Sequence, residues 1–222
     1  MDKKELKITE DGSHTLFLPG LDETYHSSHG AIQESRHVFI DAGLRYLKKR
    51  NINVLEIGFG TGLNAFLTLL ETSKNELTIN YSTLEAFPLE LSLIKQLNYT
   101  SELNLEKNVI DLFNILHEVE WEVSQSITNQ FNLKKYKIKL DNYITNEKFD
   151  LIYFDAFAPQ VQPEMWTLPV FEKMYECLNR NGVLVTYCAK GSVKRALKDV
   201  GFNIECIPGP PGKREMTRAH KL

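Results

Sequence analysis

A glycine-rich segment stands where a short apolar run gives way to a helix-like stretch. Residues 58–62 read Gly-Phe-Gly-Thr-Gly and follow the apolar run of residues 54–57. Glycine tolerates positive φ and close ligand approach, and the first N–H groups of a following helix lack partners within it. A dinucleotide fingerprint needs glycine at position 63, which is Leu63 here, whereas Gly-x-Gly-x-Gly is typical of enzymes that bind S-adenosylmethionine. A tight turn without a ligand is the alternative.

Acidic and amide residues follow two later apolar runs. Glu85 comes directly after residues 79–84 and 25 residues after Gly60. In a doubly wound sheet, a carboxylate at this place accepts hydrogen bonds from the two hydroxyls of a ribose. Asp141 and Asn142 follow an expected third strand and are placed to meet an adenine ring, although both residue types are also common in turns.

Asp155 is the candidate catalytic residue. It ends the apolar run of residues 151–154. Because ligands bind beyond the carboxyl ends of strands in open α/β sheets, Asp155 is expected to face the same crevice as the glycine segment. Phe157 and Pro159 then offer an apolar wall for a planar base, with Trp166 close in sequence. The alternative role of Asp155 is to cap the next helical segment.

The order of apolar runs predicts an α/β fold. From residue 53 onward, short apolar runs alternate with helical patterns, as in a parallel sheet that is covered on both faces. The expected strands are residues 54–57, 79–84, 137–140, 151–154, 183–187 and 202–207, and the expected helices are residues 63–71, 88–97, 169–178 and 192–200. Residues 213–220 are expected to form an antiparallel edge strand, joined to residues 202–207 by a hairpin.

The chain divides into an N-terminal extension, residues 1–50, and a main domain, residues 51–222, with a helical insertion near residues 100–132. The extension is expected to contain a hairpin of residues 6–9 and 15–18, a polar loop of residues 25–30 and a helix over residues 34–49.

Composition narrows the function classes. The chain has 222 residues, of which 42% are hydrophobic and 25% charged, as in an ordinary folded protein. No apolar run approaches the roughly 18 residues that span a bilayer, and the polar start does not resemble a secretory signal. Three widely spaced cysteines indicate a reducing compartment, so we expect a cytoplasmic protein. The histidines and cysteines show no metal-binding spacing, and no metal is expected.

Charge is unevenly distributed. The net charge of −3 gives no whole-chain attraction to nucleic acid, yet residues 190–222 contain eight basic and three acidic residues. We expect a basic rim beside the crevice, formed by Lys190, Lys194, Arg195, Lys213 and Arg214. A solvated charged face unconnected with RNA is the alternative.

Several segments together resemble the methyltransferase family that completes 5-methylaminomethyl-2-thiouridine at the wobble position of tRNA. They are residues 25–35 with Val38 and Phe39, residues 56–64 (EIGFGTGLN), residues 154–159 (FDAFAP) with 163–166 (PEMW), and residues 212–216 (GKREM). These segments span nearly the whole chain in order, and Asp-x-Phe-Ala-Pro followed by Pro-x-Met-Trp is far more specific than the glycine segment.

The resemblance implies a class I S-adenosylmethionine-dependent methyltransferase with a Rossmann-like doubly wound sheet. It implies methyl transfer to the exocyclic amine of 5-aminomethyl-2-thiouridine, with Asp155 as the catalytic residue. The implied cofactor-binding residues are Glu56, Gly58, Phe59, Gly60, Thr61, Gly62, Glu85, Asp141, Asn142 and Asp155. The implied substrate-binding residues are Tyr25, Ser27, Glu34, Phe157, Pro159, Trp166, Lys213 and Arg214.

Bifunctional members of that family carry a flavin-dependent oxidase domain after the methyltransferase domain. Because this chain ends at Leu222, it resembles the stand-alone form. Its partners are then expected to be the anticodon region of tRNA and a separate oxidase or upstream tRNA-modifying enzyme that supplies the aminomethyl group.

Asp155 is expected first to orient the amine and to stabilise its developing positive charge. Accepting the proton of the amine is its second expected role, because an aspartate with a pKa of about 3.9 is a weak base. Two other functions stay open. One is methylation of a small-molecule amine, and the other is a non-catalytic nucleotide-binding module.

Overall fold

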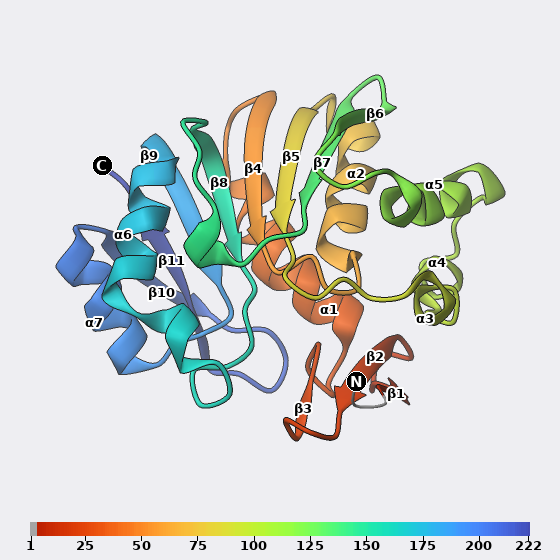
Figure 1. Ribbon diagram of the computed structural model, residues 1–222, viewed down its shortest axis with the longest axis horizontal. Helices are drawn as coiled ribbons and strands as arrows, with labels where there is room; N and C mark the ends of the chain where they lie inside the picture. The colour runs from red at the N-terminus through yellow and green to blue at the C-terminus, as the bar shows by residue number, and fades with distance from the viewer. Residues whose placement is uncertain (1–3) are drawn as a thin grey trace.

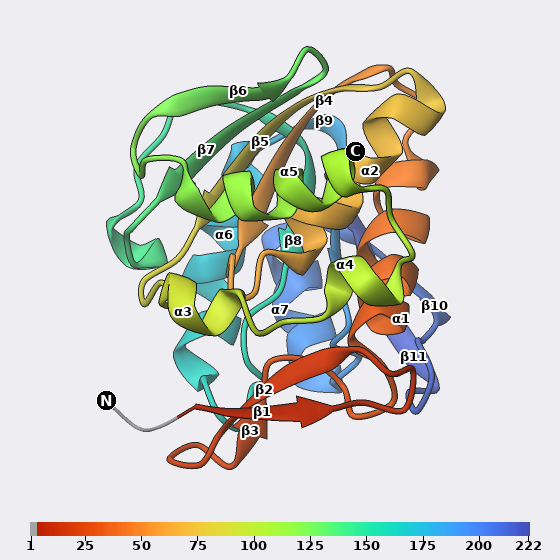
Figure 2. The same ribbon diagram turned by 90° about the vertical axis from the view of Figure 1, so that its right-hand side faces the viewer.

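An eight-stranded sheet forms the centre of the computed structural model, which describes residues 4–222 (Figures 1 and 2). Its strand order is β10-β11-β9-β8-β4-β5-β7-β6. The bounds are β4 Asn51–Ile57, β5 Thr78–Leu84, β6 Ser124–Thr128, β7 Phe131–Tyr136, β8 Phe149–Phe154, β9 Leu178–Thr186, β10 Asn203–Pro208 and β11 Glu215–His220. The predicted α/β fold with a mostly parallel sheet is confirmed.

Helices cover both faces of this sheet. Their bounds are α1 Ala31–Ser35, α2 Leu63–Asn75, α3 Leu91–Ile94, α4 Tyr99–Glu102, α5 Lys107–Glu118, α6 Leu168–Cys177 and α7 Gly191–Val200. Figure 1 shows α6 and α7 on one side and α1, α2 and α5 on the other. Strand β8 is buried over all six residues, because alternate side chains enter the two hydrophobic cores on opposite faces.

The antiparallel strand is not at the edge, and the sequence prediction was wrong on this point. Strand β11 does form a hairpin with β10, but it lies between β10 and β9 and is antiparallel to both. The edge strand is β10, whose side chains are mostly exposed or half-buried. The sequence separation between strands predicts a hairpin pairing but does not say on which side the second strand joins the sheet.

The third strand was also misplaced. Residues 137–139 lie in a loop, Leu140 begins the short 3-10 helix η3, Leu140–Asn142, and the strand is β7 instead. Its burial alternates along the chain, but Lys134 and Lys135 obscure this pattern in the sequence. The 100–132 region contains α4, α5 and the start of β7, and also the unpredicted edge strand β6, which pairs antiparallel with β7.

Two predicted helices are shorter than expected. The helix over residues 34–49 is broken into α1, the π-helix η1 Arg36–Asp41 and the 3-10 helix η2 Leu44–Tyr46. Gly43 lies at the break, where an added Cβ would stand 2.5 Å from the carbonyl oxygen of Phe39 and 3.2 Å from the ring of Tyr153. A side chain at this position would therefore collide with the preceding turn and with the sheet. Of residues 88–97, only α3 is helical.

The N-terminal sheet contains β1 Glu5–Ile8, β2 His14–Leu18 and β3 Glu23–Thr24. The predicted hairpin is confirmed, with β1 antiparallel to β2. Figures 1 and 2 show this sheet at the end of the molecule toward which β4 and β5 run. Asn98 fastens it to the main domain, because its side chain accepts a hydrogen bond from the His14 N–H (2.7 Å) and donates one to the Gly12 carbonyl (2.9 Å). Within residues 4–222, no helix has the length and apolar character of a membrane span.

Candidate active site

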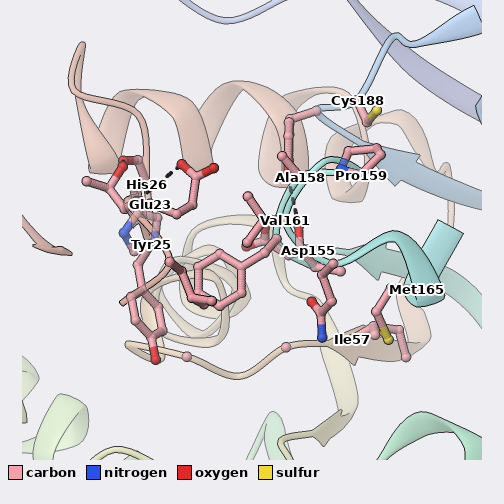
Figure 3. Close-up of a pocket in the computed structure, with 18 of the residues that line it drawn as sticks. Glu23, Tyr25, His26, Ile57, Asp155, Ala158, Pro159, Val161, Met165 and Cys188 are labelled. Atoms are coloured by element: carbon pink, nitrogen blue, oxygen red, sulfur yellow. Dashed lines mark hydrogen bonds between the residues drawn. The ribbon is translucent and has the colours of Figure 1, made fainter. Parts of the chain in front are cut away.

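A cavity of about 1640 Å³ opens at the carboxyl ends of β4, β5 and β8. Its walls come from the N-terminal sheet, the glycine segment, the loops after β5 and β8, and the loop between β10 and β11. Figure 3 shows Tyr25 and His26 on one side of this cavity and Asp155, Ala158 and Pro159 on the other. The cavity thus brings together residues from both ends of the chain.

The glycine segment has the backbone conformation that only glycine adopts easily. Gly58, Gly60 and Gly62 all have positive φ, at 95°, 49° and 72°. A Cβ on Gly58 would stand 2.5 Å from the carbonyl oxygen of Asp155, so β4 and β8 approach closely here. Gly58, Phe59, Gly60 and Thr61 line the cavity, whereas Gly62 lies behind it against His117.

Glu85 is fixed by two backbone N–H groups. Its Oε2 accepts a hydrogen bond from Gly60 (2.9 Å), and its Oε1 accepts one from Phe87 (2.8 Å). Each carboxylate oxygen can accept a further bond, and the residue lines the cavity. Asp141 also lines the cavity from η3, but Asn142 is outside its lining.

Asp155 is half-buried beside the glycine segment. Its Oδ2 accepts a hydrogen bond from Asn64 Nδ2 (2.8 Å). Burial raises the pKa of its carboxyl group to about 7, the hydrogen bond from Asn64 lowers it, and the charges of Glu34 and Lys213 act in opposite directions. A carboxylate with a pKa near neutrality can accept a proton at physiological pH, which the ordinary value did not lead us to expect.

An aromatic wall stands beside Asp155. The rings of Tyr25 and Phe157 meet edge to face with centroids 5.3 Å apart, and Pro159 lines the same region. Trp166 is buried outside the cavity lining. Its Nε1 donates a hydrogen bond to the Phe157 carbonyl (2.8 Å), so it supports the wall from behind.

An ion pair joins the N-terminal extension to the loop between β10 and β11. Lys213 Nζ lies 2.7 Å from Glu34 Oε1, and Glu34 Oε2 accepts a hydrogen bond from the Ser27 N–H (2.8 Å). Lys213 Nζ also stands 3.9 Å from the ring centroid of Tyr187. Ser27, Glu34, Lys213 and Tyr187 all line the cavity.

Two residues of the site were not predicted from the sequence. Asn64 bonds to Asp155, and its place in the first turn after the glycine segment could have indicated this. Tyr187 directly follows β9, so the rule that ligands lie beyond the carboxyl ends of parallel strands could have indicated it. Glu56, in contrast, was assigned to the cofactor but is completely buried below the cavity.

The basic rim is only partly as expected. Lys190, Lys213 and Arg214 line the cavity, but Lys194 and Arg195 do not. Lys194 instead forms an ion pair with Glu215 (2.9 Å). Two further lysines, Lys137 and Lys139, line the cavity from the loop after β7. Among residues 4–222, no group of three or more potential ligands could hold a metal ion.

The fold and site together define a class I methyltransferase: a mostly parallel sheet in which antiparallel β11 is inserted next to one edge, and a glycine turn that faces acidic strand ends. A protein family described as S-adenosyl-L-methionine-dependent methyltransferase matches residues 77–222. The chain belongs to this family, and S-adenosylmethionine is its methyl donor.

Curated relatives carry a more specific name. The "tRNA 5-methylaminomethyl-2-thiouridine biosynthesis bifunctional protein MnmC" of Pseudoalteromonas atlantica is 29% identical over 96% of this chain and 32% of the relative. The protein of the same name from Leptospira borgpetersenii is 30% identical over 88% of this chain and 32% of the relative. The chain therefore spans about a third of the length of these relatives, and the resemblance stated from its motifs is confirmed.

Solved structures agree on the fold. The crystal structure of MNMC2 from Aquifex aeolicus has a TM-score of 0.80 and 26% identity, and the match covers 99% of this chain and 70% of that one. A spermidine synthase from Thermotoga maritima matches with a TM-score of 0.57 at 12% identity, over 99% of this chain and 71% of that one. The second similarity concerns the fold alone.

The cavity fits the methyl donor of this family. The close approach of Gly58 to Asp155 leaves no room for a side chain, so the backbone itself forms the floor beside the strand ends. Glu85 presents a carboxylate whose position is fixed by two N–H groups, and it lines the cavity. This carboxylate provides acceptors for the hydroxyl groups of a polar nucleoside.

Proposed function

We propose that this methyltransferase acts on the exocyclic primary amine of 5-aminomethyl-2-thiouridine at the wobble position of tRNA. The names of the relatives support this substrate. The observation that carries the proposal is Asp155, a half-buried carboxyl group with a pKa of about 7 at the wall of a cavity of about 1640 Å³. Such a group suits an acceptor that must lose a proton.

Asp155 is proposed to take the proton of the substrate amine. A primary alkylammonium ion has no lone pair, so its nitrogen must be deprotonated before it can attack. When bound, S-adenosylmethionine supplies an electrophilic methyl group. After it passes this proton to solvent, the carboxylate of Asp155 orients the amine and stabilises the positive charge that develops on nitrogen. The hydrogen bond from Asn64 leaves the other oxygen of Asp155 free for this contact.

The two sides of the cavity have proposed binding roles. Glu85 accepts hydrogen bonds from the ribose of the donor, and Asp141 lies near its adenine. Tyr25, Phe157 and Pro159 hold the uracil ring, because aromatic and proline faces stack well on a planar base. Trp166 contributes indirectly through the Phe157 carbonyl.

Exposed cations at the mouth of the cavity are proposed to contact tRNA phosphates. Lys137, Lys139, Lys190 and Arg214 line the cavity and are exposed, and no ion pair involves them among the described residues. Lys213 is left out of this set, because its ammonium group is already bound by Glu34. Phosphate contacts supply most of the sequence-independent affinity for RNA.

We place the reaction in the cytoplasm and expect another enzyme to provide the aminomethyl group.

Methyl transfer to defined acceptors tests the proposal. Purified protein is incubated with tritiated S-adenosylmethionine and either tRNA that carries 5-aminomethyl-2-thiouridine, the same tRNA without the aminomethyl group, or the free modified nucleoside. We expect transfer to the first tRNA only, with kcat increasing as pH rises through about 7, because Asp155 must be deprotonated. Equal turnover of the free nucleoside would indicate a small-molecule amine methyltransferase instead.

A further inference from the structure

The side chain of Tyr187, which directly follows β9, extends between two loops of the cavity wall. Its hydroxyl lies 2.8 Å from the carbonyl oxygen of Ala156, in the loop after β8. Its ring centroid lies 3.9 Å from Lys213 Nζ, in the loop between β10 and β11. One side chain therefore contacts both the residue next to Asp155 and the cation that is paired with Glu34.

The hydroxyl of Tyr187 is the donor in its bond to Ala156. Burial raises the pKa of this hydroxyl above its ordinary value, and the charge of Asp155 raises it further. The phenol is therefore protonated at neutral pH. Because a carbonyl oxygen can only accept a hydrogen bond, the direction of the bond is fixed.

The main chain around Tyr187 is held firmly by the sheet. Thr186, the last residue of β9, is paired with Thr217 of β11, and both are completely buried. The Thr217 hydroxyl donates a hydrogen bond to the Cys188 carbonyl (2.7 Å), and Thr186 Oγ1 accepts one from the Cys188 N–H (3.3 Å). The residues on both sides of Tyr187 are thus fixed, so its side chain extends from a rigid backbone.

The loop after β8 depends on side chains for its position. The Asp155 N–H still donates a hydrogen bond to a carbonyl of β4 (3.0 Å). Beyond it, the Ala156 carbonyl accepts a hydrogen bond from Tyr187 (2.8 Å). The Phe157 carbonyl accepts one from Trp166 Nε1 (2.8 Å), and the rings of Trp166 and Tyr187 meet edge to face with centroids 6.2 Å apart. Two aromatic donors therefore fix the backbone next to the proposed proton acceptor.

We propose that Tyr187 is a positioning residue, whose hydroxyl fixes the backbone next to Asp155 and whose ring seats Lys213. The inference rests on the proposed function, in which Asp155 accepts the proton of the substrate amine. Because the hydroxyl of Tyr187 is already bound to Ala156, this role needs no contact between the hydroxyl and a ligand. Misplacement of a reacting group by about 1 Å can lower a rate about 100-fold, so a bond next to Asp155 matters for turnover.

Two substitutions separate the hydroxyl from the ring. Tyr187→Phe removes only the hydroxyl, so kcat for methylation of the aminomethylated tRNA should fall about 5- to 50-fold, whereas the KM for tRNA should stay within about twofold. Tyr187→Leu also removes the ring that seats Lys213. The KM for tRNA should then increase about threefold to tenfold as well, because Lys213 is next to Arg214, a proposed phosphate contact. The Kd for S-adenosylmethionine should stay within about threefold in both variants.

Tyr46→Phe is the matched control. The ring centroid of Tyr46 lies 3.7 Å from the guanidinium carbon of Arg218, so this tyrosine also carries a cation on its ring, but it is outside the cavity lining. Both kinetic constants of this variant should equal those of wild type. Wild-type kcat in Tyr187→Phe would overturn the proposal, and so would an equal loss of kcat in the control.

Combining Tyr187→Phe with Asp155→Ala tests the route. If the hydroxyl acts through Asp155, its removal should lower kcat by no more than about twofold when Asp155 is already replaced. Losses that multiply in the double variant would show that Tyr187 acts independently of Asp155, which contradicts the proposal.

NMR spectroscopy tests the hydrogen bond without any substrate. The chain contains three Ala-Phe pairs, at residues 65–66, 86–87 and 156–157. Protein labelled with ¹³C in the alanine carbonyl and ¹⁵N in phenylalanine therefore gives three signals in a spectrum that links each N–H to the preceding carbonyl. The signal that Phe157→Leu lacks belongs to the Ala156 carbonyl.

In Tyr187→Phe, the signal of the Ala156 carbonyl carbon should move upfield, because this carbonyl loses a hydrogen bond. The other two signals should keep their positions, which shows that the variant is folded. An unmoved Ala156 signal would disprove the bond from Tyr187. Because this measurement uses neither tRNA nor methyl donor, its result is independent of whether the proposed substrate is right.

Discussion

The two sides of the cavity are built in different ways. The donor side consists of β4, the glycine turn, α2 and the end of β5, and its groups are held by backbone hydrogen bonds between neighbouring elements. The acceptor side is held by side chains from distant parts of the sequence. Glu34 and Lys213, for example, are 179 residues apart and 2.7 Å from each other.

The donor side therefore depends on features of the fold, whereas the acceptor side depends on side chains that suit a particular substrate. Backbone contacts such as those of Gly60 and Gly58 depend on local conformation and tolerate little change. Side-chain contacts such as the Glu34–Lys213 pair can change without disturbing the sheet. We therefore expect substitutions on the donor side to alter cofactor affinity and substitutions on the acceptor side to alter the use of the nucleic acid.

Asp155, where the two sides meet, should give the largest effect. Asp155→Ala removes the proposed proton acceptor, so kcat should fall about 100- to 10,000-fold. The Kd for S-adenosylmethionine, measured by calorimetry, should change less than about threefold, because binding of the donor depends mainly on backbone groups and Glu85. Wild-type turnover would refute the role of Asp155. An equally large loss of affinity for S-adenosylmethionine would show that the donor and acceptor sides do not act separately.

Gly58→Ala tests the donor side. The new Cβ would stand 2.5 Å from the Asp155 carbonyl at a φ of 95°, so the free energy of unfolding in urea should fall by about 1 to 3 kcal/mol. Cofactor affinity should fall about tenfold. Gly191→Ala is the control, because its Cβ would meet only the flexible end of Arg195 at 3.4 Å. Equal effects of the two substitutions would show that position 58 does not require glycine.

The Glu34–Lys213 pair tests the acceptor side. In a double-mutant cycle with Glu34→Gln and Lys213→Met, we expect a coupling of about 1 to 2 kcal/mol in the free energy of unfolding, because Glu34 is buried. The exposed pair Arg50–Glu76, at 3.2 Å, is the control and should give less than about 0.5 kcal/mol. Cofactor affinity should be unchanged in all these variants. A coupling as small as that of the control would mean that the pair does not hold the acceptor side together.

The exposed cations at the mouth of the cavity, here called the rim, should give the smallest effect. Arg214→Glu and Lys139→Glu should each raise the KM for tRNA about threefold to tenfold. Each should also make the slope of log affinity against log salt shallower by about one, which corresponds to the loss of one phosphate contact. Lys198→Glu is the control, because Lys198 is exposed on α7 outside the cavity lining. An equal response in the control would assign the effect to net charge and not to the rim.

Local parts of the molecule could be predicted from the sequence. Strand β4, the glycine turn and α2 follow one another without a gap, so their residue types alone indicate a ligand-binding turn. Strand β8 has a continuous apolar run because both of its faces are buried. Strand β7 was missed because Lys135 is buried within it, with its Nζ donating to the His117 carbonyl (2.8 Å), and a buried lysine looks like a surface residue in a sequence.

The non-local parts could not be predicted in the same way. The partner of Glu34 depends on where the loop between β10 and β11 lies, and the place of that loop depends on the insertion of β11 beside β9. The raised pKa of Asp155 depends on burial by several segments at once. Glu56 was assigned to the cofactor by its motif, and only the packing shows that its side chain lies below the cavity.

The position of β11 also has a consequence for biosynthesis. Strands β9 and β10 leave the ribosome before β11, yet neither contacts the other in the sheet, because β11 lies between them. Until β11 emerges, β9 presents an unpaired edge and β10 has no neighbour with which to form a ladder. This part of the sheet therefore stays incomplete until β11 has emerged, which leaves the nascent chain open to edge-to-edge aggregation.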